Sequence, residues 1–149
     1  MITPRPNNQR FVRLYRRFLY RVAGRMLLLL TTRGRKTGRL HTVGLQYELI
    51  DGCYYLGVAD GERADWYRNL CAYPEVELQV GRKVIKGIAQ SISETTRVAD
   101  FLEYRLKKHP LLIRGILRSD GLKGKIDRDA LMKYAAGIRM VVITPVVEP

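Results

Sequence analysis

The spacing of apolar residues changes along the chain. Between 9 and 24, apolar side chains recur every three or four positions with arginines between them, which predicts an amphipathic helix with a basic face. After this segment the apolar residues alternate with polar ones or form short runs, which is typical of strands. We expect six strands, at 26–32, 42–50, 53–59, 75–80, 82–92 and 139–146. The segment 1–8 carries two prolines and predicts a loose tail.

Short connections between these strands predict an antiparallel sheet that closes into a small barrel. The dipeptides Asp51-Gly52 and Gly81-Arg82 are typical of tight hairpin turns. The fold class is therefore α+β, mainly β, in a single domain spanning 1–149.

Helical spacing interrupts the strands in two places. Residues 62–73 predict a short helix that Pro74 ends. A longer helical region opens with Ser93 and Glu94 as a plausible cap, and it continues through 97–110, 111–121 and 127–137.

The formal charge of +13 over 149 residues exceeds what solubility requires. Such an excess indicates an anionic partner, which leaves nucleic acid, an acidic lipid surface and a phosphorylated small molecule open. The helix at 9–24 either packs on the core or lies on an anionic membrane.

No apolar run is long enough to span a bilayer and no signal peptide pattern is present, so we expect a cytoplasmic protein, or one peripheral at the inner membrane face. Two cysteines and two histidines far apart predict neither a disulfide framework nor a metal site.

The loop at 33–41 concentrates cations between two predicted strands. Its two glycines permit backbone angles that would let amide groups converge on an anion. Arg35, Lys36 and Arg39 add charged donors, and Thr37 adds a hydroxyl. The spacing is not that of a Walker loop, because a strand follows the loop. The segment is therefore an anion cradle or a solvated basic hairpin.

A second group of residues favours the cradle. Trp66, the only tryptophan, lies near the start of the predicted short helix, after a loop that leaves a strand. If this helix meets the basic loop, the two form a groove with an aromatic wall and a cationic end. A flat aromatic cofactor with an anionic tail would suit that groove.

Three segments carry a resemblance to a known family: 29-LLTTRGRKTG-38, 66-WYRNLCAYPEVELQV-80 and 140-MVVITP-145. Together they resemble the deazaflavin-dependent nitroreductase family, whose members are split β-barrel oxidoreductases that bind coenzyme F420. The resemblance implies that Arg35, Lys36 and Thr37 hold the phosphate and glutamate tail. It implies that the deazaflavin ring is lined by the backbone of Val58, Ala59 and Asp60 together with Asp65, Trp66 and Tyr67. His41, where family members often have arginine, is a further cofactor-binding candidate, and Asn69 is interpreted as tying the short helix to the barrel.

The resemblance also implies a reaction, the transfer of a hydride from the reduced deazaflavin to a quinone, an enone or a nitro compound. Tyr67, Tyr134 and His41 are candidate proton donors, with water as an equal alternative. FMN is the alternative cofactor, and a homodimer is the expected assembly if one forms. The loop 59–65 is shorter than is usual in the family, which keeps a non-catalytic flavin, haem or lipid carrier open. A basic nucleic-acid-binding barrel is disfavoured, because the tyrosines fall mostly on apolar-periodic positions.

Overall fold

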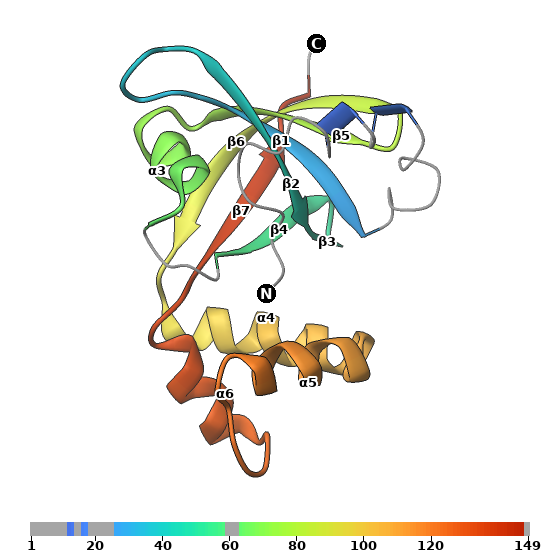
Figure 1. The fold of residues 1–149 in the computed structure, drawn as a ribbon, viewed down its shortest axis with the longest axis vertical. Helices are drawn as coiled ribbons and strands as arrows, with labels where there is room; N and C mark the ends of the chain where they lie inside the picture. Colours follow the sequence, from blue (N-terminus) through green and yellow to red (C-terminus); the bar gives the residue numbers. More distant parts are fainter. Residues whose placement is uncertain (1–11, 14–15, 18–25, 59–62, 148–149) are drawn as a thin grey trace.

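The computed structural model describes residues 12–13, 16–17, 26–58 and 63–147 (Figure 1). The predicted tail at 1–8 and most of the predicted helix at 9–24 lie outside the described residues. Both therefore stay predictions, as does contact of that helix with a membrane. Residues 12–13 and 16–17 have helical backbone. Among the described helices, none has the length and apolar character that crossing a bilayer requires.

The described strands form one antiparallel sheet that curls on itself (Figure 1). Its strand order is β2-β1-β5-β6-β7-β4-β3, and every neighbouring pair is antiparallel. The two edge strands, β2 and β3, follow one another in the chain, so the sheet must curl to bring its edges together. This confirms the predicted barrel. The strands span Leu27–Arg33 (β1), Leu40–Gln46 (β2), Glu48–Ile50 (β3), Cys53–Val58 (β4), Glu75–Val80 (β5), Lys83–Ile92 (β6) and Arg139–Pro145 (β7).

The prediction of a single strand over 42–50 was wrong, which is why seven strands are found and not six. Tyr47 lies between β2 and β3, and its amide donates to the Met26 carbonyl at 3.2 Å, one residue beyond the last β1–β2 pair of Leu27 and Gln46. β2 pairs with β1 and β3 pairs with β4, at opposite edges of the sheet. Apolar periodicity reports that a segment is extended and does not report which neighbour it pairs with.

Both predicted hairpin turns are confirmed. Asp51 and Gly52 have φ values of 50° and 79°, the left-handed conformation that a two-residue hairpin needs at both central positions. They join Ile50 to Cys53, which face each other in the ladder. Gly81 has φ of 62° and occupies the turn between β5 and β6.

Four helices among the described residues flank the sheet: α3 (Asp65–Ala72), α4 (Thr95–Lys108), α5 (Pro110–Ser119) and α6 (Arg128–Ala135). Figure 1 shows α4, α5 and α6 grouped at the end of the sheet opposite the β1–β2 hairpin, with α3 beside the barrel. Glu94 occupies the N-cap position of α4, as predicted, but its side chain accepts no capping hydrogen bond. Instead, it is α6 that a side chain caps, since Asp127 accepts from the Ala130 amide at 3.0 Å.

Two apolar cores follow from the alternation of side chains on the curled sheet. On β7, Val141 and Ile143 point into the barrel, where they join Trp66 of α3. The neighbouring Met140 and Val142 point outward and pack against α4, α5 and α6 in a second core. The sheet is thus covered on one face by its own curl and on part of the other by helices.

A buried carboxylate joins α4 to the sheet. Glu48 of β3 accepts from Lys108 Nζ at 2.9 Å and lies 3.2 Å from His109 Nε2. Arg105 Nε lies 3.6 Å from the same carboxylate, and Arg105 Nη2 donates to Gln46 at 3.0 Å. Burial lowers the pKa of Arg105 while Glu48 opposes that shift, and the hydrogen bond to Glu48 raises the pKa of Lys108.

Candidate functional site

The loop between β1 and β2 closes through its two glycines. The Gly34 amide donates to the Arg39 carbonyl at 2.7 Å, and the Gly38 amide donates to the Gly34 carbonyl at 2.8 Å. Gly38 has φ of 71°, a conformation that glycine adopts without steric cost. A β-carbon at Gly34 would lie 3.0 Å from the Arg39 carbonyl oxygen and 3.0 Å from His41 Nε2. A side chain at this position would therefore require these neighbouring atoms to shift.

Most backbone amides of this loop are already used by the protein. Besides the two glycine amides, the Arg39 amide donates to Thr37 Oγ1 at 3.2 Å and the Arg35 amide to Asn69 Oδ1 at 3.2 Å. Within the described part of the chain, the amides of Lys36 and Thr37 have no partner. The expected convergence of amides on an anion is thus reduced to this consecutive pair.

Arg35 is held in a defined position by two side chains of α3. Its Nη1 donates to Asn69 Oδ1 at 2.8 Å, and its Nη2 donates to Asp65 Oδ1 at 3.3 Å. The Asn69 side-chain amide donates in turn to Thr32 Oγ1 on β1 at 3.4 Å. These contacts confirm that Asn69 ties α3 to the barrel. Among the described residues, the remaining N–H groups of the guanidinium have no protein partner and can donate to a ligand.

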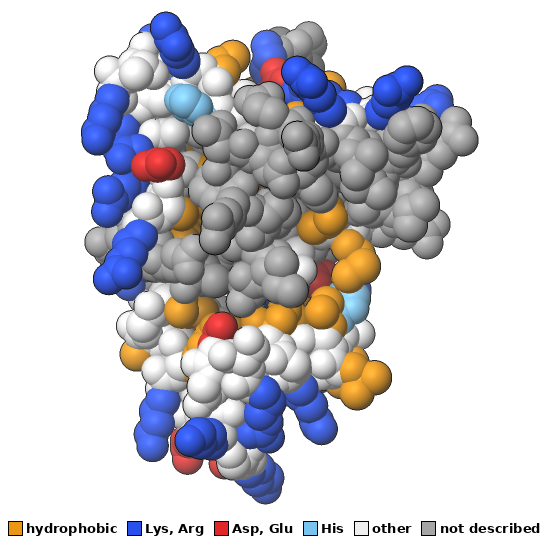
Figure 2. Space-filling model, in the orientation of Figure 1, with side chains coloured by type: hydrophobic (Ala, Val, Ile, Leu, Met, Phe, Trp, Pro, Cys, Tyr) orange, Lys and Arg blue, Asp and Glu red, His pale blue; other side chains and the backbone are white. Residues whose placement is uncertain are grey.

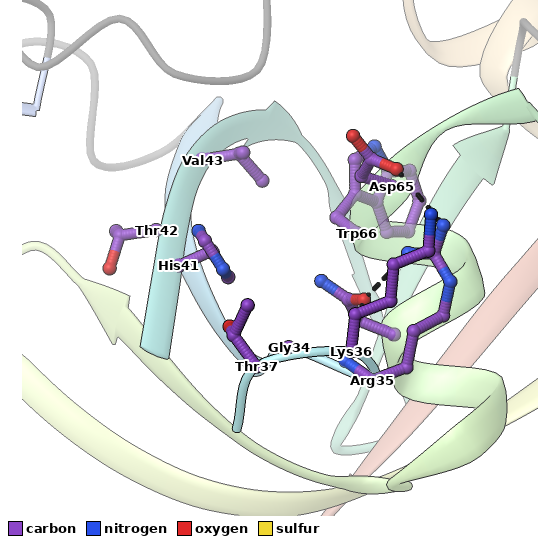
Figure 3. A pocket seen from close by; sticks show the side chains of 10 residues that line it. Gly34, Arg35, Lys36, Thr37, His41, Thr42, Val43, Asp65 and Trp66 are labelled. Carbon is purple, nitrogen blue, oxygen red and sulfur yellow. Dashed lines mark hydrogen bonds and ion pairs between the residues drawn. The ribbon is translucent and has the colours of Figure 1, made fainter. Parts of the chain in front are cut away.

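A cavity of about 340 Å³ lies between this loop, β2 and α3 (Figure 3). Arg35, Lys36 and Thr37 lie at one end, and Val43 and Trp66 come from opposite walls. The cavity has the size of a small-molecule site. It is lined by Gly34, Arg35, Lys36, Thr37, His41, Thr42, Val43, Asp65, Trp66 and Asn69.

The structure brings together six of the cofactor-binding candidates and leaves others apart. The six are Arg35, Lys36, Thr37, His41, Asp65 and Trp66, all of which line the cavity. The Val58 side chain is buried in the barrel core and does not line this cavity. Ala59 and Asp60 lie outside the described residues.

Two of the three candidate proton donors do not line the cavity either. The Tyr67 hydroxyl shares a 2.6 Å hydrogen bond with Ser91 Oγ, and its ring packs edge-on against Trp66. Tyr134 lies on α6, where its hydroxyl donates to Asp120 at 2.6 Å. Burial, and then this hydrogen bond, raise the pKa of Tyr134. His41 alone of the three lines the cavity.

Sequence reasoning did not identify Thr42, Val43 and Asn69 as part of the site. Thr42 and Val43 follow the loop on β2 and both line the cavity, but Figure 3 shows that the Val43 side chain points into it and the Thr42 side chain points away. Thr42 Oγ1 shares a 2.8 Å hydrogen bond with Thr31 Oγ1, and this bond links the two strands of the β1–β2 hairpin. The signal that could have found Val43 is the alternation of β2, which places every second residue on the face that meets α3.

Positive charge surrounds the cavity. Figure 2 shows Lys and Arg side chains along the edge of the molecule where the β1–β2 hairpin and α3 lie, with one acidic side chain among them. Arg33 lies with its guanidinium 5.0 Å from the centre of the Tyr73 ring. Such a surface attracts anionic ligands.

Comparisons with known proteins identify a family and a fold. A family model described as F420H(2)-dependent quinone reductase matches residues 5–111. An F420-H2 dependent reductase (FDR-A) is 21% identical with a TM-score of 0.53, covering 79% of this chain and 94% of that chain. HutZ, the heme storage protein from Vibrio cholerae, is 12% identical with a TM-score of 0.56, and the match covers 94% of this chain and 91% of HutZ. At these identities the likeness shows a shared split-barrel fold alone. A comparison with curated proteins found no match.

Proposed function

Because the chain belongs to the F420H2-dependent quinone reductase family, we propose that it passes a hydride from reduced F420 to a quinone. Membership confirms the predicted resemblance, the oxidoreductase class and F420 as the cofactor. The acceptor and the roles of individual residues are the proposal. The observation that carries it is a single cavity with Arg35, Lys36 and Thr37 at one end and the apolar side chains of Val43 and Trp66 on opposite walls.

The cationic end fits the phosphate and glutamate tail of F420. Lys36 and Thr37 offer consecutive amides without partners among the described residues, and Arg35 offers guanidinium N–H groups. Lys36 adds an exposed ammonium group. Backbone amides and a planar guanidinium are the donors that bind phosphate and carboxylate oxygens.

The apolar walls of the cavity fit the flat deazaflavin ring of F420. Val43 and Trp66 are both buried and line the cavity from β2 and α3. Buried apolar walls exclude water, which strengthens polar contacts and limits loss of the reduced cofactor to side reactions. Trp66 is buried and packs edge-on against Tyr67, which limits the movement of this wall.

When bound in its reduced form, F420 supplies a hydride equivalent. Reduction of a quinone to a hydroquinone also needs one proton for each hydride. His41 is the candidate donor that lines the cavity, so we assign the delivery of this proton to its side chain, with bulk water as the competing source.

Steady-state oxidation of F420H2 tests the acceptor class. The purified protein is supplied with a naphthoquinone, a cyclic enone and a nitroimidazole in parallel, and cofactor oxidation is followed by absorbance. We expect the highest kcat/KM for the quinone. A higher value for the enone or the nitro compound contradicts the assigned acceptor, and absence of turnover with all three contradicts the enzyme assignment for these acceptor classes.

A charge-matched pair of variants tests the binding site. Lys36→Gln should weaken F420 binding about tenfold, because it removes one charged donor at the cationic end. Lys83→Gln removes the same charge from the β5–β6 hairpin, outside the cavity, and should leave the Kd within about twofold. Equal effects of the two changes would mean that net charge, and not this site, determines binding.

A further inference from the structure

One buried side chain holds Arg35 at both its backbone and its head group. Asn69 is 3% exposed, and its Oδ1 accepts from the Arg35 amide at 3.2 Å and from Arg35 Nη1 at 2.8 Å. Both lone pairs of this oxygen are therefore used by the same residue. The other half of the Asn69 amide donates to Thr32 on β1. Asn69 thus connects the basic loop to two rigid elements, α3 and β1.

This arrangement limits the freedom of the cationic end. A long arginine side chain loses rotamer entropy when a ligand immobilises it, and prior fixation removes that cost from binding. The anchored Arg35 amide also directly precedes the two amides at Lys36 and Thr37. Asp65 adds a second contact to the guanidinium, but it is 74% exposed and the distance is 3.3 Å, so its hold is weaker.

We propose that Asn69 is a positioning residue for the anionic tail of the cofactor, acting through Arg35. This inference rests on the proposed function of the cavity. Asn69 lines that cavity, yet its amide oxygen and nitrogen are already bonded to Arg35 and Thr32. The ligand group that depends on Asn69 is therefore the one that Arg35 binds, and the deazaflavin ring does not depend on it.

A purely structural role for Asn69 makes a different prediction. If Asn69 only joined α3 to the barrel, its loss would weaken binding of the ring and of the tail together, because Trp66 lies on the same helix. If it positions Arg35, its loss weakens only the ligand that carries the anionic tail. The comparison of F420 with its deazaflavin chromophore lacking the phosphate and glutamates separates the two roles.

The test measures Kd for both ligands by quenching of Trp66 fluorescence, in wild type and in Asn69→Leu. We expect Asn69→Leu to weaken F420 about tenfold, which corresponds to ~1.4 kcal/mol, and to leave the tail-less chromophore within about twofold. Thr32→Val is the matched control, since it removes the other partner of the same amide. It should lower the melting temperature while keeping the wild-type ratio of the two Kd values.

Arg35 provides the coupling test. In the Arg35→Gln background, Asn69→Leu should have little further effect on F420 binding, because the group that it positions is gone. Asn69→Ser repeats the measurement with a smaller polar side chain, in case the leucine variant does not fold. An unchanged F420 preference in the folded Asn69 variant, or additive effects with Arg35→Gln, would overturn the inference.

These outcomes are distinguishable from failure of the proposed function. If wild type binds neither ligand, or binds FMN in place of F420, the site assignment itself is wrong. If wild type prefers F420 to the tail-less chromophore and Arg35→Gln abolishes that preference, the site stands. The behaviour of Asn69→Leu then decides the positioning role alone.

Discussion

Replacing Glu48 by glutamine should destabilise the protein without affecting the cofactor site. The Glu48 side chain is 5% exposed and contacts Arg105, Lys108 and His109, of which Arg105 is equally buried. The amide of glutamine keeps the shape of the carboxylate and removes its charge. The buried Arg105 guanidinium would then lack a counter-ion, and Lys108 would lose its charge-assisted hydrogen bond.

The magnitude follows from the burial of this cluster. Removing one partner of a buried ion pair costs roughly 3–5 kcal/mol, and we place Glu48→Gln at ~3 kcal/mol because glutamine still accepts one hydrogen bond. A loss of this size is a large fraction of the ~5–15 kcal/mol that stabilises an ordinary domain. Glu77→Gln is the control, since Glu77 is an exposed carboxylate on β5, and its effect should stay within about 0.5 kcal/mol.

Urea unfolding followed by circular dichroism measures both variants. We expect a lower midpoint for Glu48→Gln with an unchanged m value, because the surface exposed on unfolding is the same. The F420 dissociation constant of the folded protein should not change. If Glu48→Gln and Glu77→Gln unfold at the same urea concentration, the buried cluster does not stabilise the contact between α4 and β3, and the reasoning fails.

Three further predictions concern the site and its surroundings. His41→Gln should lower kcat at least several-fold, whereas Tyr67→Phe and Tyr134→Phe should leave kcat within about twofold, as measured by F420H2 oxidation. The opposite ranking would reassign the proton donor. Gly34→Ala should raise the Kd for F420 about fivefold in fluorescence titration, because its methyl group would press against the hairpin at 3.0 Å, and wild-type affinity would contradict the tight packing. Gly115→Ala on α5, where the added methyl meets open space, should raise stability by ~0.5–1 kcal/mol in urea unfolding, and a loss would contradict this.

Local sequence signals predicted the local structure well. The turn at Asp51-Gly52 follows from residues that tolerate positive φ, and Pro74 ends α3 because proline cannot continue a helix. Pro110 also separates α5 from α4, because proline is favoured in the first turn of a helix and cannot continue the one before it. These features depend on one or two residues and on nothing distant in the chain.

Features that depend on distant pairing were not predicted. The interruption at Tyr47 marks a change of pairing partner, because β2 and β3 belong to opposite edges of a closed sheet, which no local periodicity encodes. The Val58 side chain points into the barrel core, a direction that depends on how β4 is placed in the curled sheet, while the assignment of its backbone to the cofactor ring stays a prediction. Asn69 was correctly interpreted as a tie between α3 and the barrel, while its contact with Arg35 depends on a loop 34 residues away.

The position of the basic loop against α3 decides whether the site exists at all. The sequence predicted that a cationic hairpin and an aromatic helix would form one groove, and the cavity lined by Lys36 and Trp66 confirms that they meet. The residues of the loop could be identified from composition. The sequence could not show which amides of the loop form internal hydrogen bonds and which, among the described residues, have no partner. That division depends on the hydrogen bonds that close the loop at Gly34 and Gly38.

Titration of the purified protein with F420 and, separately, with FMN tests the central claim most directly. Trp66 is the only tryptophan and lines the cavity, so its fluorescence reports on a ring bound there. We predict saturable quenching by F420, and none by FMN at the same concentrations. Saturation by FMN with no response to F420 would contradict the account, as would the absence of a response to either ligand.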